Sequence, residues 1–296
     1  MLMGDKSKIE FCDATINPVI GCTHAGSPGC DNCWSKRLHN QRHKAYREGK
    51  RVPHQYAHPF SKVKLLPERI DQVFRWKKPK RIFWCSTSDL FHSAVPEDFI
   101  GRCRWAMAAT PHHTHIVITK RAQRLLESSR GLAHYPNGDR TQRPRIGWPP
   151  NVIVMVTVTN QQEADRDIPL LLQVEAKCRG VIVEPMLGPV DLTRIDDRDF
   201  GNDWGIHGDA LYGGLWERRG RADRYKMIRD TSRLDWVVAG PETGPHRRCA
   251  ELEWFLDLKD QAESAGVPFF LKALDIGGKI VKMPTMDGSV WDQFPA

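Results

Sequence analysis

The stretch from Val152 to Asn160 reads VIVMVTVTN, seven apolar or β-branched residues followed by two polar ones. A strand of this composition is buried on both faces, which is typical of a parallel sheet covered by helices. Thr159 and Asn160 stand at the carboxyl end of the predicted strand. In β/α folds that edge of the sheet carries the binding and catalytic side chains. The stretch therefore indicates both a fold class and a place for a site.

The same pattern recurs along the chain. Six more short apolar runs lie at Thr15–Ile20, Arg81–Cys85, His115–Thr119, Gly180–Val183, Asp235–Ala239 and Pro268–Leu271. Segments with helical spacing lie at 34–49, 65–76, 96–109, 161–178 and 250–265, and Pro169 kinks or divides the fourth of them. Apolar strands alternating with helices predict an α/β protein, a partial or complete TIM-like (β/α) barrel with parallel strands.

We expect one domain over residues 1–296, interrupted by two insertions. The first, at about 130–150, is polar and rich in Pro and Gly, which indicates a loop. The second, at about 193–233, is dense in Asp and Arg with scattered aromatic residues. Long insertions at a barrel mouth serve as lids or substrate-binding elements, or they are surface excursions, and both interpretations stay open here.

A polar or charged residue follows almost every apolar run. Taken singly, each is as well explained by a loop or a helix cap, but as a set they predict one shared mouth. The residues are Cys22, Ser86, Ser88, Asp89, Thr119, Lys120, Thr159, Asn160, Glu184, Glu242 and Lys272.

One of these residues opens a cysteine loop. Residues 21–34 read GCTHAGSPGCDNCW and space Cys22, Cys30 and Cys33 as C-x7-C-x2-C. Thiolates are strong ligands for zinc and for iron–sulfur clusters, and a Cys-x2-Cys turn directs two sulfurs to one centre. Three cysteines suit a cluster with one iron left open, whereas structural zinc needs a fourth ligand. That ligand could be Cys12, His24, His39 or His43, and unliganded thiols are a third interpretation.

Composition and charge restrict the classes of protein. The formal net charge is +8 with a pI near 9.1, which favours polyanionic partners. Basic residues gather in residues 36–51 and 77–81. The polar N-terminus lacks a signal core, and no apolar run approaches the ~20 residues of a membrane span. Eight cysteines in a chain of this length are no disulfide framework, so we expect a cytoplasmic protein without membrane contact.

Longer motifs carry a resemblance. NPVIGCTHAGSPGCDNCW, SDLFH, ITKR, VEP with LGPV, a Gly-x-Glu-x-Gly turn and PFFLK occur in that order. From Glu10 to about Gly278 the chain closely resembles a phage-associated family of unassigned function known by its three-cysteine motif. The cysteine loop itself resembles that of radical S-adenosylmethionine enzymes, particularly the lyase-like branch that includes spore photoproduct lyase. The first cysteine gap is longer than their usual C-x3-C-x2-C, and Ser86 to Asp89 replaces their Gly-Gly-Glu turn.

The resemblance implies cofactors and roles. Cys22, Cys30 and Cys33 would hold a [4Fe–4S] cluster whose open iron binds S-adenosylmethionine, and an electron donor would reduce it. The resemblance also places Trp34 near the adenine of that cofactor. From their strand-end positions we expect cofactor contacts by Ser86, Ser88, Asp89, Thr119, Lys120, Thr159, Asn160 and Glu184. We expect catalytic roles for Glu242 and Lys272 at strand ends and for Cys249, a redox candidate next to the Gly-x-Glu turn.

Two functions follow as hypotheses. The first is a radical enzyme that modifies or repairs a nucleic acid or nucleotide in a phage or mobile-element context, with a possible protein partner encoded nearby. The alternative is a zinc-stabilised nucleic-acid-binding protein without catalytic activity, whose basic residues contact phosphate.

Overall fold

The computed structural model describes residues 6–130, 147–196, 206–219, 224–229 and 232–296. The chain divides into two compact units, Met1–Val154 and Met155–Ala296. The division falls inside β6 (Val152–Val158), the strand that carries the VIVMVTV run. A single domain over the whole chain stays a prediction.

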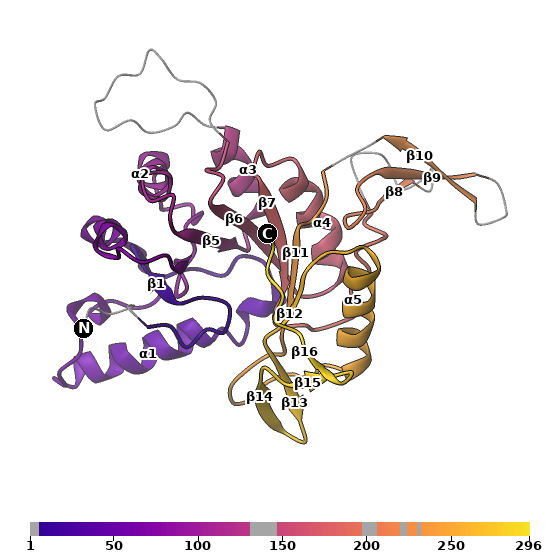
Figure 1. Cartoon of the computed structure of the whole chain (residues 1–296). Coiled ribbons are helices and arrows are strands. Elements are labelled where there is room, and N and C mark those ends of the chain that lie inside the picture. Colours follow the sequence, from indigo (N-terminus) through magenta and orange to yellow (C-terminus); the bar gives the residue numbers. More distant parts are fainter. Residues whose placement is uncertain (1–5, 131–146, 197–205, 220–223, 230–231) are drawn as a thin grey trace, which may run out of the picture. The chain divides into compact units, whose positions relative to one another are not determined.

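Seven strands form the main sheet (Figure 1). Their order is β1 (Ala14–Ile16), β4 (Arg81–Trp84), β5 (Thr114–Thr119), β6, β7 (Cys178–Val183), β11 (Trp236–Ala239) and β12 (Phe269–Leu271). Each of them overlaps one of the seven predicted apolar runs, and spatial order follows chain order as repeated β/α units require. The predicted α/β class with parallel strands is confirmed, and the linear strand order is consistent with a partial barrel.

In the N-terminal unit, β1 and β5 pair in parallel with the two sides of β4. The side chains of Ile16, Ile82 and Trp84 are fully buried in this part of the sheet. The predicted strand over residues 15–20 is two strands, because Pro18 has no amide hydrogen with which to continue a ladder. After it, β2 (Val19–Ile20) pairs antiparallel with β3 (Lys64–Leu65).

Three α-helices accompany these strands in the described part of the N-terminal unit. They are α1 (Trp34–Arg47), α2 (Glu97–Ala108) and α3 (Ala122–Arg130), with short 3-10 turns η1 (Pro28–Cys30) and η2 (His54–Tyr56). We did not predict α3. Residues 131–146 of the first predicted insertion lie outside the described residues.

One predicted helix has a different form. The segment expected over 65–76 is the 3-10 helix η3 (Pro67–Arg75). Its buried residues are Ile70 and Val73, which lie three positions apart. Three residues per turn place both on one face of the 3-10 helix.

In the C-terminal unit, β7 and β12 pair in parallel with β11. The unit's helices are α4 (Gln161–Leu172) and α5 (Leu252–Ser264). Pro169 lies within α4, which ends earlier than predicted because Cys178 already begins β7. No helix in the described ranges combines the length and apolar character that crossing a membrane requires.

Small antiparallel sheets complete the C-terminal unit. The described part of the second predicted insertion forms β8 (Ile206–Gly208), β9 (Leu215–Arg219) and β10 (Arg224–Arg229), with β9 in the middle. After β12 come two further pairs, β13 (Ala273–Ile276) with β14 (Lys279–Lys282), and β15 (Thr285–Met286) with β16 (Ser289–Val290).

Candidate functional site

The cysteine loop begins at a residue that has to be glycine. Gly21 follows β2 with φ +85°, and a Cβ there would lie 2.7 Å from the carbonyl oxygens of both Phe60 and Lys62. The next amide, that of Cys22, donates to the Phe60 carbonyl at 2.9 Å. The close backbone approach therefore fixes the direction in which the chain leaves the strand and enters the loop.

The other two cysteines lie at helix boundaries. Cys30 ends η1, whose N-cap Ser27 accepts from the Gly29 amide at 3.2 Å. Cys33 caps α1, and its Sγ lies 3.5 Å from the Lys36 amide nitrogen. Both cysteines are therefore positioned by the first turns of helical segments.

The loop's histidine is already engaged. His24 Nδ1 accepts from the Gly26 amide at 3.0 Å, and its Nε2 lies 3.0 Å from Asp31 Oδ1. Because both ring nitrogens are used inside the loop, His24 offers no lone pair to a metal in this arrangement. The ring instead ties the first half of the loop to Asp31, between Cys30 and Cys33.

The remaining candidates for a fourth zinc ligand also have partners. His39 Nε2 bonds the His58 carbonyl, His43 Nδ1 bonds the Tyr56 carbonyl, and Cys12 Sγ donates to Ser7 Oγ. Among the described residues, no group of three or more His, Cys, Asp or Glu is gathered for a single metal ion. A preformed structural zinc site is therefore not seen in this part of the chain.

A cluster makes a different demand on the donors. It binds its thiolates on separate irons, so its ligands stand farther apart than those around one ion. Cys22, Cys30 and Cys33 are half-buried thiols on one loop, outside any disulfide. The loop therefore supplies three thiol donors of the chemical kind that iron–sulfur clusters use.

An arginine faces the first cysteine. Arg121 Nη1 lies 3.7 Å from Cys22 Sγ, and Arg121 Nη2 donates to the Thr23 carbonyl at 3.0 Å. Burial raises the pKa of Cys22 to about 11, and the Arg121 guanidinium opposes that rise. The cation thus favours the thiolate at a position where burial favours the thiol.

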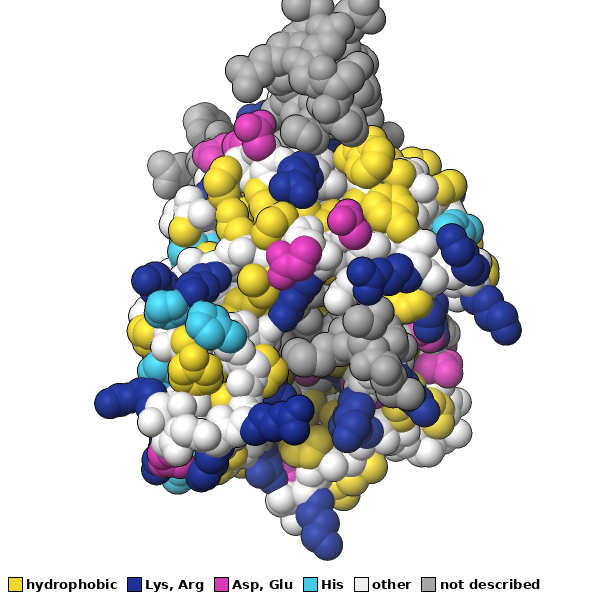
Figure 2. Space-filling model, turned by 90° about the vertical axis from the view of Figure 1, so that its left-hand side faces the viewer, with side chains coloured by type: hydrophobic (Ala, Val, Ile, Leu, Met, Phe, Trp, Pro, Cys, Tyr) yellow, Lys and Arg dark blue, Asp and Glu magenta, His cyan; other side chains and the backbone are white. Residues whose placement is uncertain are grey.

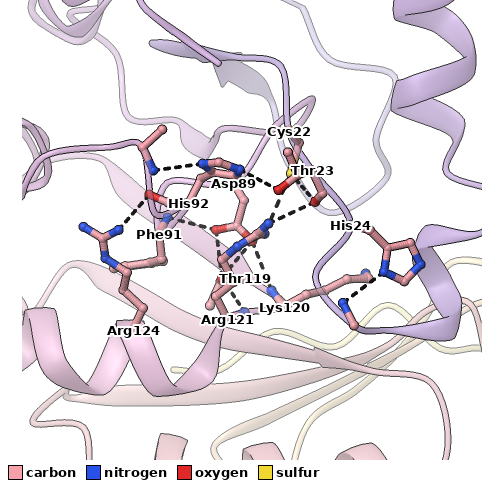
Figure 3. Close-up of polar contacts among 12 residues, drawn as sticks. Cys22, Thr23, His24, Asp89, Phe91, His92, Thr119, Lys120, Arg121 and Arg124 are labelled. Atoms are coloured by element: carbon pink, nitrogen blue, oxygen red, sulfur yellow. Dashed lines mark hydrogen bonds and ion pairs between the residues drawn. The ribbon is translucent and has the colours of Figure 1, made fainter. Parts of the chain in front are cut away.

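Asp89 holds this arginine in place (Figure 3). Its carboxylate accepts from Thr119 Oγ1 at 2.8 and 2.9 Å, from Arg121 Nη1 at 3.0 Å, and from the Phe91 and Lys120 amides. With its side chain 8% exposed, Asp89 is a buried and fully engaged anchor. The predicted residues Asp89, Thr119 and Lys120 therefore meet, and here they organise Arg121.

A second contact to the loop comes from His92. His92 Nδ1 accepts from the Ala94 amide at 3.0 Å, so the ring proton is on Nε2, which lies 2.8 Å from Thr23 Oγ1. Burial lowers the pKa of His92, with a further contribution from Arg121, and keeps the ring neutral. Thr23 is thus held by Arg121 through its carbonyl and by His92 through its hydroxyl.

The serines after β4 make internal contacts. Asn17 Oδ1 accepts from Ser86 Oγ at 3.2 Å and from the amide and hydroxyl of Thr87 at 3.0 Å. Ser88 Oγ donates to the Val19 carbonyl at 2.7 Å, and Ser35 Oγ of α1 donates to the Thr87 carbonyl at 2.6 Å. The carboxyl ends of β1 and β4 are thereby joined to the helix that follows the cysteine loop.

Trp34, the residue after the last cysteine, is 42% exposed. A core aromatic at this position would be buried, so its ring is available for stacking against a ligand. A role in cofactor binding stays a prediction.

The C-terminal unit has its own polar group at strand ends. Glu184 follows β7, and its carboxylate oxygens lie 2.6 and 2.5 Å from Nζ of Lys272, which follows β12. Between these strands runs β11, followed by Gly240, where a Cβ would come within 3.3 Å of the Glu184 carboxylate. Because Gly240 has no side chain, there is space for the Glu184–Lys272 ion pair to cross the end of β11.

Glu242, predicted as catalytic, is paired. Its Oε2 accepts from the Arg248 amide at 2.8 Å and Nε at 3.0 Å, and its Oε1 lies 2.5 Å from Nη2. At 4% exposure, this carboxylate is a buried partner of Arg248. Cys249 follows directly and is exposed.

Thr159 and Asn160 cap a helix. Asn160 Oδ1 accepts from the Glu163 amide at 3.0 Å, and Glu163 Oε2 accepts from the amide and hydroxyl of Thr159 at 2.8 and 2.7 Å. This reciprocal arrangement resembles a capping box and begins α4. Cofactor contacts by these two residues stay a prediction.

The predicted set omitted Arg121, His92, Thr23 and Asn17. Arg121 could have been predicted, because residues two apart at a strand end point to the same side of the sheet and Thr119 was already in the set. For Asn17 and His92 no local pattern indicates a partner, since both contact residues about 70 positions away in the chain.

Comparison with known proteins identifies a family and one structural likeness. The chain belongs to the family described as "Protein of unknown function (DUF5131)", which matches residues 6–295. No match was found among the curated proteins. Among solved structures, a spore photoproduct lyase mutant matches with 12% identity and a TM-score of 0.42, over 92% of this chain and 79% of that one. A likeness of this size carries no argument about function.

Proposed function

We propose that this member of the family binds a [4Fe–4S] cluster at Cys22, Cys30 and Cys33 and acts as a radical S-adenosylmethionine enzyme. The observation that carries the proposal is the cysteine loop, with three half-buried thiols between β2 and α1 outside any disulfide. Both ring nitrogens of the loop's histidine are engaged, which leaves three thiols as the loop's donors. Three donors match a cluster that keeps one iron open.

When bound, such a cluster supplies the one-electron reduction of S-adenosylmethionine that starts radical chemistry on a substrate. The chain's own residues hold the site. Gly21 directs the loop, Cys33 caps the N-terminus of α1, and Arg121 places a cation beside Cys22. The exposed Trp34 offers a stacking surface next to Cys33.

The substrate that we propose is a nucleic acid or nucleotide. The chain carries a net charge of +8. Lys36, Lys44 and Arg47 are exposed on α1, which begins at the cysteine loop. Figure 2 shows Lys and Arg side chains spread over one face, with hydrophobic side chains between them. Cations interleaved with apolar groups suit a phosphate backbone with stacking bases.

Anaerobic reconstitution with iron and sulfide tests the cluster. We expect about four irons per chain, an electron paramagnetic resonance signal after reduction, and a changed signal when S-adenosylmethionine is added. Alanine at Cys22, Cys30 or Cys33 should abolish iron retention, whereas Cys249→Ala, at an exposed cysteine outside the loop, should retain it. Protein that retains zinc in place of iron under the same conditions would support the zinc alternative.

A further inference from the structure

We infer that Arg121 is the positioning residue of the cluster site, held by Asp89 so that its guanidinium fixes the Cys22–Thr23 turn and places a positive charge beside the first metal-binding sulfur. The inference rests on the proposed function and assigns the site a residue that the cysteine motif does not contain.

The first part of the argument is the anchoring of Arg121. Its side chain is 16% exposed, and its guanidinium lies 3.0 Å from the carboxylate of Asp89, whose side chain is 8% exposed. Thr119 Oγ1 donates to both Asp89 oxygens and accepts from the Arg121 amide at 2.9 Å. A largely covered arginine held at its amide and its guanidinium has little rotamer freedom, so its direction is set before any ligand binds.

The second part is what the anchored guanidinium touches. Nη2 donates to the Thr23 carbonyl at 3.0 Å, while Nη1 reaches Cys22 Sγ at 3.7 Å. Cys22 and Arg121 are 99 positions apart in the chain, so the contact joins the cysteine loop to the carboxyl end of β5. Outer contacts of this kind orient metal ligands and tune the bound centre.

The third part is the chemistry of the charge. A cluster that accepts an electron becomes more negative, and a fixed cation next to one of its sulfur ligands stabilises that reduced form. Arg121 therefore raises the reduction potential of the site compared with a neutral side chain at the same place.

The chain offers a matched control in Arg124, which lies on α3 three residues after Arg121. Its guanidinium donates to the carbonyls of His92 and Val95 and pairs with Glu97, so its partners among the described residues lie outside the cysteine loop. Arg124→Gln removes the same charge from the same region of the chain while leaving Cys22 and its arginine in place.

Two measurements test the inference. In metal-free protein, Arg121→Gln should raise amide hydrogen exchange over residues 21–33. Arg124→Gln, which reaches the loop only indirectly through His92, should raise it less. In reconstituted protein, Arg121→Gln should shift the cluster potential to more negative values and weaken iron retention by roughly 10- to 100-fold, as removal of outer-shell partners does. Arg121→Lys should restore the potential in part. Asp89→Asn, which removes the anchor of the Arg121 guanidinium, should raise amide hydrogen exchange over residues 21–33 as Arg121→Gln does.

The outcomes separate the two proposals. Wild-type protein that takes up no iron overturns the proposed function, while the exchange experiment still reports whether Arg121 orders the loop. The inference alone is overturned by a different pair of results. In that case the wild-type protein takes up iron, and Arg121→Gln matches Arg124→Gln in both amide exchange and cluster potential.

Discussion

Gly21 shows how much of the site depends on one residue. Both Gly21 and Gly26 have positive φ, but a Cβ at Gly21 would meet two carbonyl oxygens at 2.7 Å, whereas Gly26 has nothing within 4 Å. We expect Gly26→Ala to cost about 1–2 kcal/mol of unfolding free energy from its backbone conformation. Gly21→Ala should cost roughly 1–3 kcal/mol more, because its neighbours are backbone and must move. Denaturant unfolding measures both, and equal losses would contradict the steric argument.

A second single residue, His115, predicts how the free energy of unfolding depends on pH. It is fully buried, accepts from Trp84 Nε1 at 3.0 Å, and burial lowers its pKa to about 3. In the unfolded chain its pKa returns to about 6.5, so the unfolded state binds the proton more tightly and stability falls as pH drops below that value. From about pH 7 to pH 5 the loss should be about 2 kcal/mol.

The variant His115→Gln isolates that contribution, because glutamine does not titrate in this range. We expect the unfolding free energy of the variant to change by about 2 kcal/mol less than that of the wild type over the same pH interval. Parallel pH profiles for the two proteins would mean that another group is responsible.

At the scale of elements, the ends of β7, β11 and β12 depend on the Glu184–Lys272 pair, whose members are partly buried. We expect Glu184→Gln and Lys272→Met each to destabilise the protein, and the double variant to lose less than the sum. A coupling of roughly 1–3 kcal/mol is reasonable for a direct contact of this kind. Urea unfolding of the four proteins in the cycle measures the coupling, and additive losses would show that the pair does not form in solution.

At the scale of the whole molecule, the surplus of positive charge predicts salt-dependent binding. If exposed cations of α1 contact phosphates, the logarithm of the DNA affinity should fall linearly with the logarithm of salt concentration. Replacing Lys36 and Arg47 with Glu should reduce that slope by about one unit for each lost contact. Lys279→Glu, at an exposed lysine of the C-terminal unit, should change the slope less. Binding that does not depend on salt would contradict a nucleic-acid substrate.

Local pattern was enough for the main sheet. A strand covered on both faces must be apolar along its whole length, and the seven apolar runs correspond to the seven strands. Local pattern did not predict the exact form of two elements. Pro18 divided one predicted strand, and the three-residue spacing of Ile70 and Val73 accompanied a 3-10 helix.

By itself, then, the chain's sequence determined the parallel α/β framework, the cysteine loop and the strand-end positions of its polar residues, because burial and turn chemistry act within a few residues. Only the tertiary structure decided which of those polar residues meet. Asp89 holds an arginine 32 positions away, and Glu184 pairs with a lysine 88 positions away. Such partners depend on which strands are neighbours and on the space that residues such as Gly240 leave between them, and neither is encoded in local spacing.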